Sequence, residues 1–172
     1  PVVVDKEVFE LIERSIAISN LTQGAFDITY GSIEKGLWNF DTNMTALPSH
    51  EIAKKMVYLI NYRNIILNKE QLSVMLLNKG MRIGFGGIGK GYAAEMAKKK
   101  LVERNVLSGI INASGDLTTW GTQASGKPWT IGIAHPDHPS SAFSCLNISG
   151  KAIATSGNYE KCIIINGKKF SH

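Results

Sequence analysis

The chain is poor in cysteine and contains no long apolar run. Its 172 residues include two cysteines, Cys145 and Cys162, and no C-x-x-C pair, and its four histidines show no metal-ligand spacing. These absences exclude a disulfide-rich scaffold and a zinc site built on thiols. No apolar stretch approaches the roughly 18 residues that a membrane-spanning helix needs. We expect a globular protein in which the two cysteines are either cross-strand neighbours or, preferably, buried free thiols.

Acidic residues are outnumbered by basic ones. The chain has 14 Asp and Glu against 19 Lys and Arg, a net charge of +5. Mild basicity of this kind suits an anionic ligand. The basic residues are scattered and aromatic residues do not alternate with them, so the pattern does not indicate a nucleic-acid-binding face.

Glycine is concentrated in one place. Five of the eight residues after Ile83 are glycine, and a run of helix formers follows. Glycine allows positive φ and close approach of another molecule, and a helix N-terminus presents N–H groups to phosphate. Residues 84–89 match G-x-G-x-x-G, the dinucleotide-binding pattern, and Glu103 could serve as the acidic residue that binds the ribose. Residues 84–90 also match the start of a P-loop, but Gly91 stands where a P-loop has the Ser or Thr that holds magnesium. A tight turn that binds nothing fits the same pattern.

Hydrophobic periodicity predicts an α+β fold. We expect helices at residues 5–20 with Asp5 as N-cap, at 50–61 with Ser49 as N-cap and with its apolar residues facing inward, and at 90–104. Expected strands, with a hairpin at Asn166-Gly167, cover 64–67, 72–76, 81–83, 109–112, 117–120, 129–133, 143–148, 152–154 and 162–165. A doubly wound dinucleotide domain needs further alternating helices, so we predict helices packed on a mainly antiparallel sheet.

Four segments in order resemble one family. They are residues 24–29 (GAFDIT), the glycine run 84–94, residues 112–117 with 126–133, and residues 154–160. Together they resemble the ApbE family, the FAD:protein FMN transferases, formerly described as thiamine-biosynthesis lipoproteins. The resemblance covers the whole chain. It implies a T-fold-like α+β fold and a single FAD-binding domain over 1–172 that is truncated at both ends, since the chain starts at Pro1 and ends within a predicted strand.

The resemblance also implies a reaction. In the family, FAD is split at its pyrophosphate, FMN passes to a Thr or Ser hydroxyl of an acceptor flavoprotein, AMP leaves, and magnesium assists. Family members are often exported and anchored by lipid at the outer face of the bacterial inner membrane. We therefore expect FAD as substrate, Mg²⁺ as cofactor, an acceptor flavoprotein as partner and a missing lipoprotein segment.

The family's functional positions can be placed on this sequence. The resemblance implies FAD contacts, a magnesium ligand through the main-chain carbonyl of Gly87, and a role in transfer for His172. The implied FAD contacts are Ala25, Phe26, Asp27, Gly84, Lys90, Thr155 and Ser156. Gly84 is a departure, because many relatives have Asp there.

Other interpretations remain open. Phe26 can be a core residue and Asp27 a turn cap, and Lys90 can be a solvated lysine at a helix start. The chain can also belong to a non-catalytic flavin-binding protein of the same fold. A nicotinamide-dependent oxidoreductase would rest on G-x-G-x-x-G alone.

Overall fold

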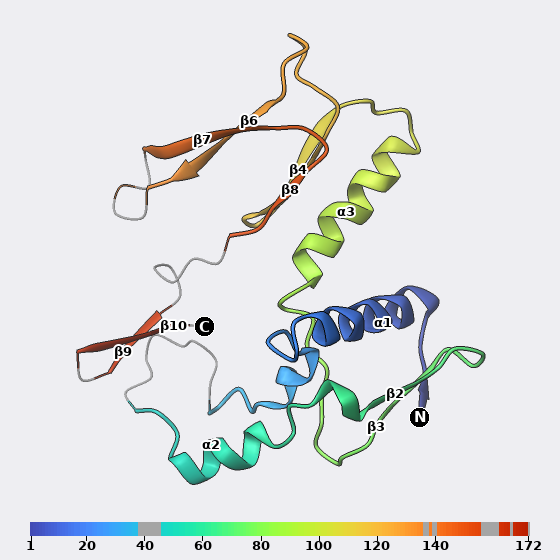
Figure 1. Cartoon of the computed structure of the whole chain (residues 1–172), viewed down its shortest axis with the longest axis vertical. Helices are drawn as coiled ribbons and strands as arrows, with labels where there is room; N and C mark the ends of the chain where they lie inside the picture. Colours follow the sequence, from blue (N-terminus) through green and yellow to red (C-terminus); the bar gives the residue numbers. More distant parts are fainter. Residues whose placement is uncertain (38–45, 136–137, 139–140, 156–161, 166, 172) are drawn as a thin grey trace. The chain divides into compact units, whose positions relative to one another are not determined.

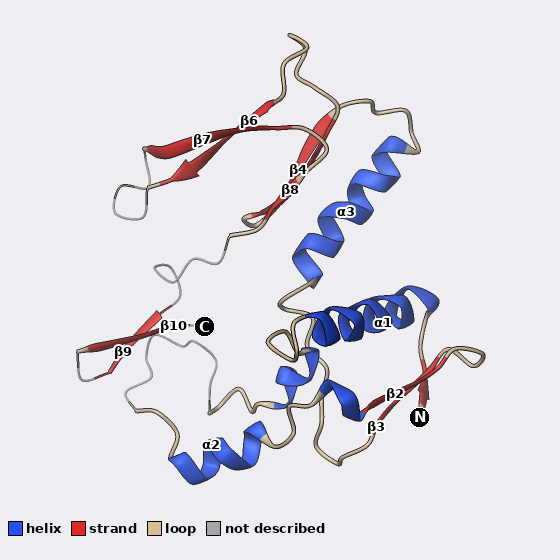
Figure 2. Ribbon diagram, viewed as in Figure 1, coloured by secondary structure: helices blue, strands red, loops and turns tan. Residues whose placement is uncertain are grey.

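The computed structural model describes the chain except for residues 38–45, 136–137, 139–140, 156–161, 166 and 172 (Figure 1). It contains two compact units, Pro1–Gly87 with Lys161–His172, and Ile88–Glu160. Helices and strands both occur in quantity (Figure 2), and every strand pair among the described residues is antiparallel. The predicted α+β class is confirmed, although the strands form several small sheets. In the described part of the chain, no helix has the length and apolar content to cross a membrane.

The first unit combines one long helix with a small sheet. Three strands pair in the order β1-β3-β2. The residues before the glycine run form β1 (Val2–Val3), α1 (Lys6–Leu21), the 3-10 helix η1 (Ile28–Ser32), α2 (His50–Val57), the 3-10 helix η2 (Tyr62–Asn64), β2 (Ile65–Asn68) and β3 (Ser73–Leu76). The β2–β3 hairpin and the helix α1 are close to their predicted bounds.

Helix α1 supplies the centre of the first unit's core. Phe9 and Ile12 lie on one face of the helix and are 2% and 3% exposed. They pack with Ile28, Ile65 and Val74 from η1 and the small sheet. Burying a side chain of this size contributes about 1.5–3 kcal/mol. Helix α1 therefore fixes the platform from which η1 begins.

The predicted helix over 50–61 is shorter than expected and more exposed. Ser49 caps α2 as predicted, since its Oγ accepts the Ile52 amide at 3.4 Å. The helix ends at Val57 and none of its residues is fully buried. The predicted inward face is wrong for Ile52, which is exposed, whereas Met56, Leu59 and Ile60 are half-buried. Further along, Asn61 donates its amide to Thr29 Oγ1 at 2.8 Å. The backbone near residue 61 is thus held by η1 instead of continuing the helix.

The second unit packs one helix on a sheet. Helix α3 (Gly89–Val102) contacts β4 (Gly109–Ala113) and β5 (Asp116–Trp120), and β5 also pairs with β8 (Ala152–Ile153). A separate ribbon consists of β6 (Trp129–Ala134) and β7 (Ala142–Ile148). These strands agree with the predicted ones. The helix matches the prediction of 90–104 to within two residues at each end.

The predicted burial of the cysteines is wrong for Cys145, and the burial of Cys162 stays a prediction. Cys145 is exposed, because it lies on β7, where nearly every residue faces solvent. In the strand register Cys145 pairs with Gly132, so it is not the ladder partner of Cys162.

Cys162 begins β9 (Cys162–Ile165), which forms an antiparallel hairpin with β10 (Lys168–Ser171). Gly167 has φ 75° there, as a hairpin turn at this position requires.

Candidate functional site

Asp27 organises the A-F-D segment through its carboxylate. One oxygen, Oδ1, accepts the Thr29 amide at 2.8 Å and the Thr29 hydroxyl at 2.6 Å. The other, Oδ2, accepts the Tyr62 amide at 2.8 Å. Asp27 is thus the N-cap of η1 and ties it to η2. The capping role considered from the sequence is confirmed, and a contact with FAD stays a prediction.

Phe26 lies against the glycine run. Its side chain is half-buried and packs on the core of the first unit. A Cβ atom at Gly87 would be 3.2 Å from Phe26 Cε2, which is tighter than nine in ten real Cβ contacts. The core role of Phe26 is therefore confirmed, and glycine at 87 lets the backbone pass over the ring. Ala25 is exposed beside it, and its contact with FAD stays a prediction.

Alternate amides before helix α3 are already bonded to η1. The Arg82 amide donates to Ser32 Oγ at 2.9 Å, and the Gly84 amide donates to the Ile28 carbonyl at 2.8 Å. The Gly86 amide donates to the Tyr30 hydroxyl at 3.0 Å. The predicted strand at 81–83 is wrong, because this extended segment pairs with a 3-10 helix and not with another strand. The amides of Gly84 and Gly86 are likewise engaged, so the run is only in part an open nest for phosphate.

Close backbone contact explains the glycines at 31 and 84. A Cβ atom at Gly31 would be 2.7 Å from the Gly84 nitrogen, so the two backbones cross with no room for a side chain. A Cβ atom at Gly84 would be 3.1 Å from Tyr30 Cζ. Tyr30 therefore lies where the side chain of the expected Asp would begin.

Sequence reasoning missed Tyr30. It directly follows the recognised segment 24–29, and no local pattern connects it with a glycine 56 residues away. An aromatic residue beside a motif is a weak signal by itself. Only the pairing of η1 with residues 82–86 places its hydroxyl in the glycine run.

Lys90 meets the third sequence motif inside the second unit. Its Nζ donates to the Ser114 carbonyl at 3.2 Å. Ser114 and Gly115 form the turn between β4 and β5 with φ of 56° and 97°, and Asn112 Oδ1 accepts the Gly115 amide at 2.8 Å. Lys90 is exposed at the helix start, as one of the interpretations from the sequence had it, and this bond ties its ammonium group to the turn. Its contact with FAD stays a prediction.

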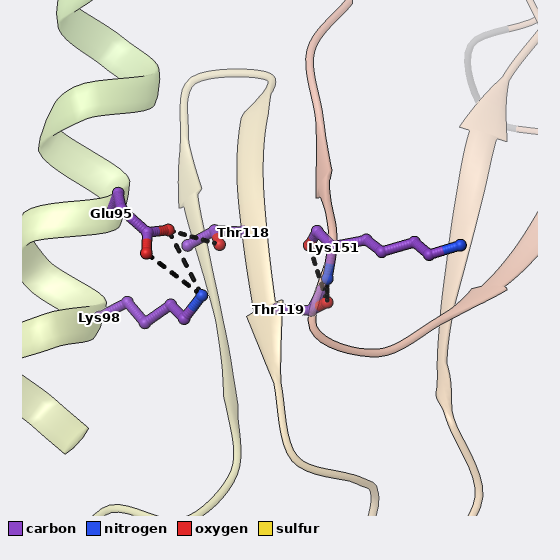
Figure 3. A network of polar contacts seen from close by, with 5 residues as sticks. All are labelled: Glu95, Lys98, Thr118, Thr119 and Lys151. Atoms are coloured by element: carbon purple, nitrogen blue, oxygen red, sulfur yellow. Dashed lines mark hydrogen bonds and ion pairs between the residues drawn. The ribbon is translucent and has the colours of Figure 1, made fainter.

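A small network of polar contacts includes one hydrogen bond between α3 and the sheet (Figure 3). Glu95 on the helix accepts the Thr118 hydroxyl at 3.1 Å and pairs with Lys98 at 3.3 Å. Thr119, the next residue of β5, donates its hydroxyl to the Lys151 carbonyl at 2.9 Å. Both threonines are buried, at 3% and 0% exposure. The bond between Glu95 and Thr118 therefore joins the sheet to the helix that carries Lys90.

The described residues do not form a magnesium site by themselves. No group of three or more His, Cys, Asp or Glu side chains that could hold a metal occurs among them. The Gly87 carbonyl is one suitable oxygen, whereas Mg²⁺ requires near-octahedral oxygen coordination, in part from water. Magnesium binding at Gly87 stays a prediction.

The remaining site residues are less well placed. Thr155 is described and exposed, two residues after β8. Ser156 and His172 lie outside the described residues, so their roles stay predictions.

Comparison with known proteins decides the family. A family model described as the ApbE family matches residues 1–172, the whole chain. The chain belongs to the ApbE family. The match confirms the resemblance that the four motifs indicate, and all four of those motifs lie within it.

The relatives of this ApbE chain are named as transferases. It is 31% identical over 173 residues to an FAD:protein FMN transferase of Klebsiella pneumoniae (strain 342), covering all of this chain and 52% of the relative. It is 26% identical to the Escherichia coli (strain K12) FAD:protein FMN transferase, covering 98% of this chain and 49% of the relative. The chain thus spans about half the length of these curated relatives.

Solved ApbE structures share its fold. The crystal structure of the ApbE protein from Thermotoga maritima matches with a TM-score of 0.87 and 32% identity, over 99% of this chain and 55% of that one. The apo flavinyl transferase ApbE of Pseudomonas stutzeri matches with a TM-score of 0.77 at 24% identity, over 92% of this chain and 49% of that one, and supports the fold alone.

Proposed function

We propose that this chain forms the FAD-binding part of an FAD:protein FMN transferase. The reaction would transfer FMN from FAD to a Thr or Ser hydroxyl of an acceptor flavoprotein, with release of AMP. One observation carries the proposal: the family motifs meet in pairs, with Phe26 against Gly87 in the first unit and Lys90 on the Ser114 turn in the second. The names of the relatives support the same activity.

The side chains of Phe26 and Lys90 suit the positioning of a flavin nucleotide. Phosphoryl transfer depends chiefly on orientation and on stabilising negative charge. An ammonium group has three donors, and the Ser114 carbonyl uses one of those on Lys90. The tether holds the cation in place while its remaining donors stay available for phosphate oxygens. The half-buried Phe26 ring offers a flat apolar wall beside a backbone that carries no side chain at Gly87.

Two parts of the proposed reaction rest on the resemblance. Magnesium, when bound, would neutralise negative charge on the phosphates. We propose that the reaction requires it, although the described residues do not supply a complete set of ligands. His172 is proposed to assist proton loss from the acceptor hydroxyl, a role that suits imidazole.

The experiment uses the longer protein that contains this chain. We expect AMP release from FAD and covalent, fluorescent flavin on an acceptor flavoprotein, both dependent on Mg²⁺ and abolished by EDTA. An acceptor with its target Thr replaced by Ala serves as the control and should stay unlabelled. Failure to release AMP or to label the acceptor in the presence of magnesium would contradict the proposal.

The second candidate is a non-catalytic flavin-binding protein of the same fold. It requires only the flavin-nucleotide contacts proposed above and no metal site. It predicts FAD binding without AMP release under the same conditions. A nicotinamide-dependent oxidoreductase is disfavoured, because the described strands pair only antiparallel and provide no parallel crossover.

Export and membrane anchoring are also part of the proposal. They rest on the family resemblance, which implies a lipoprotein segment and a location at the outer face of the bacterial inner membrane. Digestion of the tagged, full-length protein by protease added to spheroplasts would support export. Protection until the membrane is lysed would contradict it.

A further inference from the structure

The Tyr30 hydroxyl lies inside the glycine run on a rigid support. Its oxygen accepts the Gly86 amide at 3.0 Å. The neighbouring η1 residues Ile28, Thr29 and Ser32 are 1%, 0% and 1% exposed, whereas Tyr30 is 42% exposed. The backbone is thus fixed in the core while the tyrosine faces solvent.

The hydroxyl keeps its own proton available for another molecule. A phenol has one donor and accepts through its oxygen, and the bond from Gly86 uses only the oxygen. Accepting a hydrogen bond polarises the O–H group and makes it a better donor. Among the hydrogen bonds of the described residues, Tyr30 Oη appears only as an acceptor. The geometry therefore presents an O–H donor at a surface position.

The surroundings leave the hydroxyl open to an oxygen atom of a ligand. Gly84 and Gly86 have no side chains that would keep a ligand from the hydroxyl, and Gly86 is exposed. Their amides are already bonded to η1, so the run offers this O–H where an open glycine nest would offer N–H groups. The net charge of +5 favours negative ligands.

We propose that Tyr30 donates its hydroxyl proton in a hydrogen bond to a phosphate oxygen of the bound flavin nucleotide. This rests on the proposed function and adds a binding residue outside the four family motifs. Hydrogen bonds from hydroxyl to charged oxygen are short and strong. Tyr30 then selects ligands that carry phosphate.

The test compares ligands with and without phosphate on the full-length protein. FAD binding is measured by fluorescence, and ADP and riboflavin are measured by competition against it. Tyr30→Phe keeps the ring, and we expect it to weaken binding of FAD and ADP by about 10- to 100-fold, the range of a hydrogen bond to a charged group. Riboflavin, which has no phosphate, should bind equally well to both proteins.

The control is Tyr58→Phe, since Tyr58 directly follows α2 and its side chain is 73% exposed. It should change none of the three affinities. A loss of folded protein lowers apparent affinity for every ligand alike, so the ratio of FAD to riboflavin affinity separates binding from stability. An equal loss for riboflavin, or no loss for FAD, would overturn the role of Tyr30 and leave the proposed function intact. A wild-type protein that binds no FAD would overturn both.

Discussion

Replacing Gly86 by alanine should destabilise the protein, and replacing Tyr30 by phenylalanine beforehand should remove most of that cost. The new Cβ atom would overlap the Tyr30 hydroxyl oxygen but lie 3.6 Å from Tyr30 Cζ, an ordinary contact distance. Gly86 does not have positive φ, so its backbone accepts alanine. The clash therefore depends on one oxygen atom.

The magnitude follows from three effects. Gly86→Ala displaces the hydroxyl and loses its hydrogen bond, at about 0.5–1.5 kcal/mol, and adds about 1 kcal/mol of overpacking, the low end of the usual range, because the overlapping atom is the tip of a partly exposed side chain. Alanine regains roughly 0.4–1 kcal/mol through the unfolded chain. We expect a net loss of about 0.5–2 kcal/mol in the free energy of unfolding. Tyr30→Phe alone should cost about 0.5–1.5 kcal/mol, since the Gly86 amide is exposed and can be hydrated.

Urea unfolding of the four proteins, followed by circular dichroism, measures the coupling. In the Tyr30→Phe background, Gly86→Ala should change the free energy of unfolding by less than about 1 kcal/mol, giving a coupling energy of about 1–3 kcal/mol. Gly91→Ala is the matched control, because a Cβ atom there has open space, and its effect should add to that of Tyr30→Phe. A coupling below about 0.5 kcal/mol would refute the contact between Tyr30 and Gly86.

Three further measurements address the core, the cap and the exposed thiol. Phe9→Ala should lower the free energy of unfolding by about 3–5 kcal/mol, whereas Leu21→Ala, at a side chain 84% exposed, should change it little; similar values for both would contradict the proposed core. Asp27→Asn should lower the free energy of unfolding by about 1–3 kcal/mol, because an amide NH₂ group cannot accept a hydrogen bond from a backbone N–H. Asp5→Asn is the control, since Asp5 stands at a helix N-cap without a side-chain hydrogen bond, and equal effects of the two changes in urea unfolding would contradict the capping role of Asp27. Cys145 should react with a maleimide in the native protein, and mass spectrometry of its peptide after digestion should show the adduct. An unmodified Cys145 would contradict the exposure of this thiol.

Much of the fold is readable from local pattern. The α1 face with Phe9 and Ile12 repeats with helical spacing, and the β-branched runs after residue 109 become strands near their predicted positions. These signals work because each element buries one face of its own sequence. Helix α2 shows the limit: its apolar spacing is helical, yet none of its residues is buried.

The site depended on contacts between distant residues. The A-F-D segment and the glycine run were recognisable as motifs, but their meeting at Phe26 and Gly87 was not. Lys90 is a helix-start lysine as expected, but its partner, the Ser114 carbonyl, is 24 residues away and gives no local signal. Tyr30 gave no local signal, since its partner amide at Gly86 belongs to another segment.

The alternation before α3 also constrains the length of the chain. Amides at even positions 82, 84 and 86 bond to η1, whereas the side chains of Ile83 and Phe85 pack against the core. Inserting one residue here would exchange the two sets, so that large side chains would meet η1 and glycines would face the core. Inserting two residues would preserve the alternation. Inserting two residues in this segment should therefore destabilise the protein less than inserting one.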